Sequence, residues 1–253
     1  MSIHLAGIQR FPVKGLSPQP LDSAQLGQDA PLPGDRRFAL AHGASAFDAA
    51  QPAWQKKAHF LNGARNPALA KLKASYDESG TRISLASNGA SLLEDADLLK
   101  PEGRAALADA LLPLFEREAR GKLMVAVAPG VSFADVQPGY LSIQNRASLD
   151  DFSDKLGQYV DARRMRGNLL LEGAAAWDEM HWPGRRFRLG GAELDVVEII
   201  GRCANTTLNP DSGERDIETL DGLQRFYGHT DCGVYARVTK PGRIMVGDSL
   251  TEI

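Results

Sequence analysis

The feature that most constrains this chain is a series of short apolar segments, which glycine and proline interrupt at close spacing. The 253 residues include 25 glycines and 14 prolines, and no apolar run reaches the ~20 residues of a membrane-spanning helix. Residues 72–76 and 83–85 alternate apolar and polar side chains across a turn, which predicts a hairpin. Residues 186–189 and 192–200 flank a Gly-Gly pair, which also predicts a hairpin. Several short strands at close spacing predict a barrel-like sheet with helices added to it.

Two segments have the pattern of helices instead. Residues 102–120 place apolar side chains on one face at helical spacing, and Pro113 interrupts them, so we expect a kink or two short helices. The members of this face are Leu107, Leu111, Leu114 and Phe115. A second short helix is predicted to begin at Ser148 as its N-cap and to end near Gly157. The predicted fold class is therefore mainly β with some helix (α+β).

The remaining segments are interpreted as loops and further strands. Residues 41–67 contain scattered glycine and proline, which predicts mainly loop. Residues 123–127 and 169–171 are short apolar runs of the length of strands. A last hairpin is predicted between residues 234–238 and 244–246. The chain length allows one large domain or two small ones.

Composition excludes some functions and sets expectations for others. The net charge is −3 and the pI is near 6.0, so the chain as a whole has no electrostatic footprint for nucleic acid. The N-terminus has no basic stretch ahead of a long apolar core, so we expect a cytoplasmic protein that does not bind membranes. Its two cysteines cannot form a disulfide framework or supply the four thiolates of an ordinary 2Fe–2S cluster. Any electron chemistry must therefore draw on a separate electron-donor protein.

The densest polar run, residues 201–213, follows the predicted strand that ends at Ile200. It places Cys203 beside Arg202 and ahead of two threonines. Positive charge beside a thiol favours the thiolate, which is both a nucleophile and a soft metal ligand. The alternative is a small buried hydrophobe, since free cysteine is among the most buried residue types. The polar run argues against plain core filling, but spacing alone leaves both interpretations open.

Four blocks in the same order resemble the MOSC family. Residues 11–16 together with 34–40 resemble its N-terminal β-barrel domain. Residues 166–171 resemble its Arg-Pro-Asn-hydrophobic signature, and residues 242–248 its closing strand. Residues 202–213 carry an Arg-Cys pair, two threonines and Asx-Pro-Asp-x-Gly, which resembles the family hallmark. Any one block is a weak signal, whereas four in order are specific.

The resemblance implies both a fold and a cofactor. The fold is a MOSC-type β-barrel over residues 96–253 with an N-terminal β-barrel-like lobe over residues 1–95. The family's relatives include the mitochondrial amidoxime-reducing component and its bacterial counterparts, so the implied cofactor is the molybdenum cofactor, Mo-molybdopterin. Cys203 matches the cysteine that ligates the metal, so it is predicted to be both the catalytic residue and the metal ligand.

The resemblance also implies a set of cofactor-binding residues. Arginine binds phosphate with two parallel hydrogen bonds, and lysine acts as a point charge. The implied set is Lys14, Arg36, Arg37, Ser142, Asn145, Arg166, Asn168, Arg202, Thr206 and Thr207. Only one of Arg36 and Arg37 is expected to face the ligand, because successive strand residues point to opposite faces. Arg163 and Arg164 are expected to be surface charges.

Three positions depart from the family pattern. Gly15 replaces the usual serine, Gly167 the usual proline, and Asn209 the usual aspartate. The second cysteine, Cys232, is interpreted as a core or lining residue. A role as a resolving partner for Cys203 would require the two sulfurs to approach closely.

Three functions are compatible with these observations. The first is a molybdenum-dependent oxidoreductase, which reduces N-hydroxylated or related small-molecule substrates with electrons from a separate reductase. The second is a sulfurtransferase, in which Cys203 carries a persulfide to a metal centre. The third is a non-catalytic carrier of the molybdenum cofactor. Metal analysis separates the second from the other two, and a reductase assay separates the first from the third.

Overall fold

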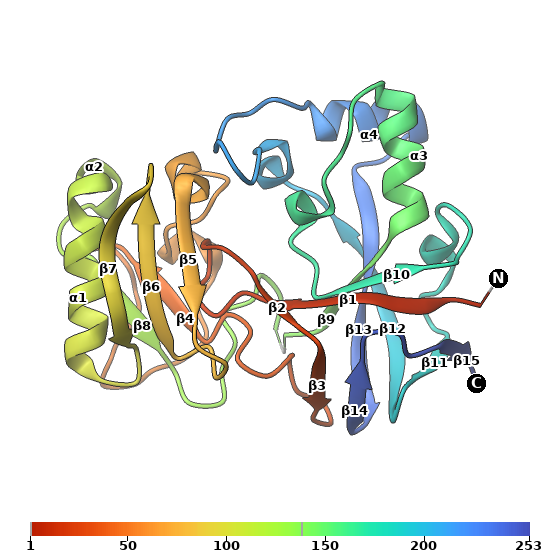
Figure 1. Ribbon diagram of the computed structural model, residues 1–253, viewed down its shortest axis with the longest axis horizontal. Helices are drawn as coiled ribbons and strands as arrows, with labels where there is room; N and C mark the ends of the chain where they lie inside the picture. The colour runs from red at the N-terminus through yellow and green to blue at the C-terminus, as the bar shows by residue number, and fades with distance from the viewer. Residues whose placement is uncertain (1, 138) are drawn as a thin grey trace.

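The computed structural model describes residues 2–137 and 139–253, which form two lobes side by side (Figure 1). Strands account for 34% of the chain and helices for 23%, which confirms a fold that is mainly β with some helix. Both ends of the chain lie in one lobe, here called the terminal lobe, and the other is called the middle lobe. Among the described residues, no helix combines the length and the apolar character that a membrane crossing requires.

The terminal lobe is built on an eight-stranded sheet with the order β15-β11-β12-β13-β9-β10-β1-β2. Neighbouring strands are antiparallel except for β9 and β10, which are parallel. The sheet curls into a half-barrel around an apolar core that includes Leu5, Trp182 and Leu194. The predicted hairpin across the Gly-Gly pair is confirmed as β11 and β12. The strands are β1 (His4–Arg10), β2 (Gln19–Leu21), β9 (Leu141–Asn145), β10 (Leu169–Glu172), β11 (Arg186–Leu189), β12 (Ala192–Gly201), β13 (Asp231–Lys240) and β15 (Leu250–Glu252).

The middle lobe consists of two small sheets and two short helices. Strand β4 (Phe38–Ala41) pairs with β8 (Met124–Val127), while β5 (Leu72–Tyr76), β6 (Arg82–Ser87) and β7 (Ala90–Asp97) form a three-stranded sheet. The predicted hairpin is confirmed as β5 and β6.

The helical segment of the middle lobe breaks at its proline, as predicted. Helix α1 (Pro101–Leu111) ends just before a turn that contains Pro113, and α2 (Glu116–Ala119) follows. Leu107, Leu111 and Phe115 are buried as expected. The prediction is wrong for Leu114, which is 45% exposed, because the break at Pro113 rotates that position away from the core.

A segment of the terminal lobe reaches into the core of the middle lobe. Residues 11–18, between β1 and β2, insert Val13 and Leu16 into the apolar cluster of the middle lobe, and Val13 bridges Phe38. The division at residue 95 stays a prediction, since strand pairing does not show which segments fold independently. Pairing does place β1 and β2 in the same sheet as the strands that follow residue 140.

The last predicted hairpin is wrong, because its second strand pairs with a different strand from the one predicted. Strand β14 (Gly242–Met245) pairs with β3 (Ser23–Leu26) instead of β13. Both edges of β13 are already occupied, by β12 and β9, so the chain after Pro241 pairs elsewhere. This pairing brings segments about 220 residues apart together.

Helices α3 (Arg146–Leu156) and α4 (Thr219–Tyr227) pack on the terminal lobe (Figure 1). The prediction that Ser148 caps α3 is wrong. Asn145 is the N-cap, and its side chain accepts a hydrogen bond from the backbone N–H of Ala147 at 3.2 Å. Ser148 lies inside the helix and is fully buried. Gly157 ends α3 in the left-handed conformation, as predicted, whereas α4 was not predicted.

Candidate functional site

Cys203 lies in a cleft between the two lobes, directly after the end of β12 at Gly201. Its backbone is extended, and the short 3-10 helix η6 (Ala204–Thr207) begins after it. The side chain is half-buried, so it is neither a core residue nor a fully exposed one. A sulfur in this position is accessible to a ligand in the cleft.

The threonines after Cys203 hold the loop in shape. The Thr206 hydroxyl donates to the Cys203 carbonyl at 3.0 Å, and the Thr207 hydroxyl donates to the Ala204 carbonyl at 2.9 Å. Thr206 also shares a buried hydrogen bond of 2.6 Å with Thr219 at the start of α4. Both hydroxyls therefore serve to position the cysteine, and only Thr206 lines the cleft.

Buried cationic groups face Cys203 from other parts of the chain. Lys14, which is 6% exposed, donates from Nζ to the Phe133 carbonyl at 2.7 Å and to Asp135 Oδ1 at 2.5 Å. Burial lowers the pKa of Lys14, although Asp135 opposes this shift. Burial alone would raise the pKa of Asp135, but the charge and hydrogen bond of Lys14, together with the charges of Lys57 and Arg36, outweigh it and hold that pKa at about 2. The two side chains are paired as a salt bridge in the structure.

Two arginines lie against the Phe11 ring. The guanidinium carbons of Arg36 and Arg166 lie 4.8 and 4.1 Å from the ring centroid. Arg36 bonds to Asp35 and donates to the Arg166 carbonyl at 3.1 Å, while Arg166 donates to the Leu16 carbonyl at 3.0 Å. Burial lowers the pKa of Arg166, and repulsion by Arg36 lowers it further. Such a pair of like charges is stabilised by an anion bound between or beside them.

Ser142 and Asn168 lie on the neighbouring parallel strands β9 and β10 or at their ends, and they bind each other. The Ser142 hydroxyl donates to Asn168 Oδ1 at 2.9 Å, and the backbone N–H of Asn168 donates to the Ser142 hydroxyl at 3.0 Å. Asn168 Nδ2 donates to the Gln9 carbonyl at 3.3 Å. This pair fixes the wall of the cleft next to Arg166.

Seven of the ten predicted cofactor-binding residues line the cleft together with Cys203. They are Lys14, Arg36, Ser142, Arg166, Asn168, Arg202 and Thr206. Arg202 points its N–H groups at protein carbonyls, including that of Met165 at 2.9 Å, so it joins neighbouring loops.

The other three predicted residues lie outside the cleft. Arg37 is exposed and rests on the Phe38 ring, so only Arg36 of this pair faces the cleft. The reason differs from the expected strand alternation, because Arg36 lies in a turn before β4 and has a left-handed backbone. The Asn145 side chain caps α3, and the Thr207 hydroxyl donates to the Ala204 carbonyl within its own loop.

The sequence alone did not reveal several residues of the cleft. Arg164, predicted to be a surface charge, is 5% exposed, and this prediction is wrong. It forms an ion pair with Asp216 at 2.7 Å and donates to the Thr207 carbonyl at 3.2 Å, because η6 folds back over it. Tyr140 and Tyr235 also line the cleft, with ring centroids 6.3 Å apart. No local sequence signal marks these contacts, since their partners lie far along the chain.

Each departure from the family pattern has a local structural counterpart. Gly15 has a φ of +91°, where a serine would be strained. A Cβ atom on Gly167 would lie 2.6 Å from Cδ of Gln144. Asn209 donates to Asp216 at 2.7 Å, a bond that an aspartate could not make.

Cys232 is a core residue, as interpreted from the sequence. It is 1% exposed and packs in the apolar cluster beneath α3 and α4. Burial raises the pKa of its thiol to about 11, so it is neutral at physiological pH.

The donor set of the cleft fits a soft metal carried by an anionic organic group. Among residues 2–137 and 139–253, no group of three or more histidine, cysteine or acidic side chains is placed to hold a metal ion. A metal at Cys203 would thus take one sulfur from the protein and its other ligands from the group that carries it. Buried Lys14 and half-buried Arg36 and Arg166 are suited to a phosphate on that group.

Comparisons with known proteins agree with these features. Residues 131–251 match the MOSC domain family. Over 130 residues the chain is 32% identical to mitochondrial amidoxime-reducing component 1 of Mus musculus and 30% identical to that of Homo sapiens. Each match covers 47% of this chain and 37% of the relative, so the matched segment spans well under half of these curated relatives.

Solved structures that are similar to this chain include the YuaD protein from Bacillus subtilis. It has a TM-score of 0.44 and 12% identity, covering 99% of this chain and 94% of that one. YiiM from Geobacillus stearothermophilus has a TM-score of 0.36 and 18% identity, covering 45% of this chain and 53% of that one.

Proposed function

Because residues 131–251 of this chain form a MOSC domain, we propose that the cleft binds a molybdenum cofactor and that Cys203 ligates the molybdenum. The observation that carries this proposal is that a half-buried sulfur shares one cleft with buried cationic side chains. A thiolate supplies the soft ligand, and the cations supply the charge that a phosphate requires.

The chain's own residues would bind and orient this group. Arg166, Arg36 and Lys14 would hold its phosphate, and the Ser142–Asn168 pair would fix the wall against which it rests. Thr206 would keep the Cys203 carbonyl in place, so that the sulfur points into the cleft. When bound, the cofactor would supply two-electron reduction chemistry that no side chain can provide.

The reaction proposed is the reduction of N-hydroxylated or related small molecules. For a hydroxylamine, R–NHOH takes up two electrons and two protons, which gives R–NH₂ and water. The two cysteines of the chain cannot supply the four thiolates of an ordinary 2Fe–2S cluster, so a separate reductase would deliver the electrons. The names of the curated relatives, which describe amidoxime-reducing components, support this substrate class.

Elemental analysis tests the proposal. Protein expressed in a host that makes the cofactor is expected to retain stoichiometric molybdenum, and Cys203→Ser is expected to lose it. Cys232→Ala is the matched control, since it removes the other sulfur and should retain the metal. Full retention in Cys203→Ser would refute thiolate ligation. Molybdenum without reductase activity would favour the carrier, and a persulfide on Cys203 without molybdenum would favour the sulfurtransferase.

A further inference from the structure

A second cavity adjoins the cleft that holds Cys203, and we call it the side pocket. Its volume is 330 Å³, which lies within the range of about 300–1,000 Å³ that is typical of small-molecule sites. The two cavities share a wall that consists of Gly15, Gly63, Arg164, Arg166 and Asn205. The side pocket is therefore a neighbour of the proposed cofactor site and has a lining of its own beyond this wall.

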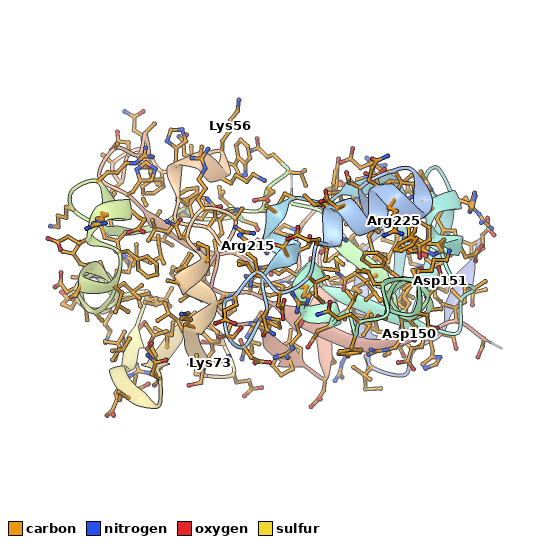
Figure 2. The ribbon with its side chains drawn as sticks, turned by 90° about the horizontal axis from the view of Figure 1, so that it is seen from above. Lys56, Lys73, Asp150, Asp151, Arg215 and Arg225 are labelled. Atoms are coloured by element: carbon orange, nitrogen blue, oxygen red, sulfur yellow. The ribbon has the colours of Figure 1, made fainter. Side chains whose placement is uncertain are left out.

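The side pocket reaches the surface away from the cleft. Figure 2 shows Lys56 and Lys73 at opposite edges of the junction between the lobes, with Arg215 between them. Exposed Lys73 lines the side pocket, whereas Lys57, next to Lys56 in the chain, lines the cleft. A ligand can therefore enter the side pocket without passing Cys203.

One side of the side pocket is apolar. Its leucines are at most 4% exposed and form a floor, and two prolines lie beside them. Burial of apolar surface favours an organic ring on this floor over a bare inorganic ion. The amide of Asn205 adds both a hydrogen-bond donor and an acceptor, as the edge of a nucleobase requires. The apolar lining residues are Leu16, Pro18, Leu69, Ala70, Leu72, Leu208 and Pro210.

The lining also contains two exposed cations, one from each lobe, that bind the same carboxylate. Lys73 of β5 lies 3.1 Å from Asp211, and Arg163 of the short 3-10 helix η4 (Ala162–Met165) lies 2.7 Å from it. Hydrogen bonds from Arg163 and Lys73 lower the pKa of Asp211 to about 2, although that side chain is 62% exposed. The position between the two cations therefore favours an anionic oxygen.

We propose that the side pocket binds a nucleoside monophosphate, whose phosphate replaces the Asp211 carboxylate between Lys73 and Arg163 and whose base lies on the apolar floor. A phosphate offers more acceptor oxygens and more charge than a carboxylate, and arginine binds it with two hydrogen bonds. The nucleotide is either a free molecule or the attached half of a larger cofactor that also fills the cleft. Only the second source rests on the proposed function.

Isothermal titration calorimetry of the full, metal-free chain tests the proposal with AMP, GMP, CMP and UMP in turn. The tightest of the four is expected to bind at least about tenfold more tightly than its nucleoside or inorganic phosphate, because each of these lacks half of the contacts. Ala70→Phe fills the side pocket and should raise the Kd about tenfold or more. Ala68→Phe is the matched control at an exposed position of the same 3-10 helix, η2 (Pro67–Lys71), and should bind like wild type.

Charge variants give changes of opposite sign. Asp211→Asn removes the competing carboxylate and keeps its shape, so it should lower the Kd about threefold or more. Lys73→Met should raise the Kd about tenfold, while Lys71→Met, an exposed lysine outside the side pocket, should have little effect. Weaker binding in Asp211→Asn, or unchanged binding in Ala70→Phe, would overturn the proposal. Equal affinity for inorganic phosphate would show an adventitious ion only.

Mass spectrometry of protein from a host that makes the cofactor distinguishes the two sources. Nucleotide released by denaturation alone is a free ligand, whereas nucleotide released only after pyrophosphatase treatment belongs to a larger cofactor. In both cases Ala70→Phe should carry less of it, and equal amounts in wild type and Ala70→Phe would refute the site. Loss of the proposed molybdenum function leaves the titration of metal-free protein unaffected, so the two failures are distinguishable.

Discussion

At the scale of residues, the arrangement around Phe11 is costly for the fold. Arg36 and Arg166 both have left-handed backbones, with φ of 49° and 51°, and such strain costs of order 1–3 kcal/mol at each residue. Both side chains are also kept close together in a poorly solvated place, where like charges repel. Asp35 offsets part of this repulsion through its ion pair with Arg36, and an anion in the cleft, as the proposed cofactor would supply, would offset more of it.

The Lys14–Asp135 pair leads to a prediction about acid stability. The pKa of Asp135 in the folded protein is about 2, below its ordinary value of 3.8. The pair therefore contributes fully to stability above about pH 3.8, and this contribution is lost as the pH falls toward 2. Replacing Lys14 with methionine removes this contribution. We therefore expect the difference in unfolding free energy between wild type and Lys14→Met to shrink between about pH 4 and pH 2.

Urea unfolding at a series of pH values measures this difference. Lys57→Met serves as the control, since Lys57 is exposed and lies 3.6 Å from the same carboxylate, and its effect should be smaller. A difference for Lys14→Met that does not change with pH would show that the ion pair does not control acid stability.

At the scale of elements, one arginine links η6 to the middle lobe. Arg215 donates to the Ala204 carbonyl and the Thr207 hydroxyl, each at 2.5 Å, and to the Ala64 carbonyl at 2.8 Å. The first two acceptors belong to η6, and the third belongs to the cleft wall in the middle lobe. Arg215 is therefore a positioning residue for the loop that begins at Cys203.

Arg215→Ala is expected to loosen this loop. Alkylation of Cys203 by iodoacetamide should become faster by about threefold or more, because local opening exposes the sulfur more often. Peptide mass spectrometry separates Cys203 from buried Cys232, which should stay unmodified in every variant. Arg215→Lys, with one amine for three acceptors, should give an intermediate rate, and Arg225→Ala is the control for an exposed arginine elsewhere. An unchanged rate in Arg215→Ala would rule out the positioning role.

At the scale of the whole molecule, the two lobes are interleaved along the chain. The first strands belong to the terminal lobe, residues 38–127 form the middle lobe, and the chain then returns. Val13 and Leu16 cross over to the core of the middle lobe, while Arg215 and Asp211 bind residues of that lobe from the other side. These contacts connect the two lobes that form the cleft.

This interleaving predicts a single cooperative unfolding transition. The middle lobe loses Val13 and Leu16 from its core when the terminal lobe unfolds, so the calorimetric enthalpy should equal the van't Hoff enthalpy. Differential scanning calorimetry of the full chain measures both. Two resolved peaks would show instead that residues 1–95 and 96–253, or another pair of segments, unfold as separate domains.

Patterns that lie within a few residues were predictable. The β5–β6 and β11–β12 hairpins follow from alternation on either side of a turn, and the break in the helical segment follows from Pro113. These features depend on local backbone geometry and on hydrophobic periodicity, and residues close together in the sequence determine both. The resemblance to the MOSC family, confirmed for residues 131–251, added Cys203 and seven of the other residues that line its cleft.

The sequence by itself therefore determined the fold class and two hairpins, and its family resemblance singled out Cys203. Only the tertiary structure decided that β14 pairs with β3, that Arg164 is buried against Asp216, and that Arg215 meets Ala64 at the cleft. The physical reason is that these contacts join residues tens to hundreds of positions apart. The free energy of these contacts depends on which strand edges and cavities remain unoccupied after the rest of the chain has packed. A local sequence pattern does not contain this information.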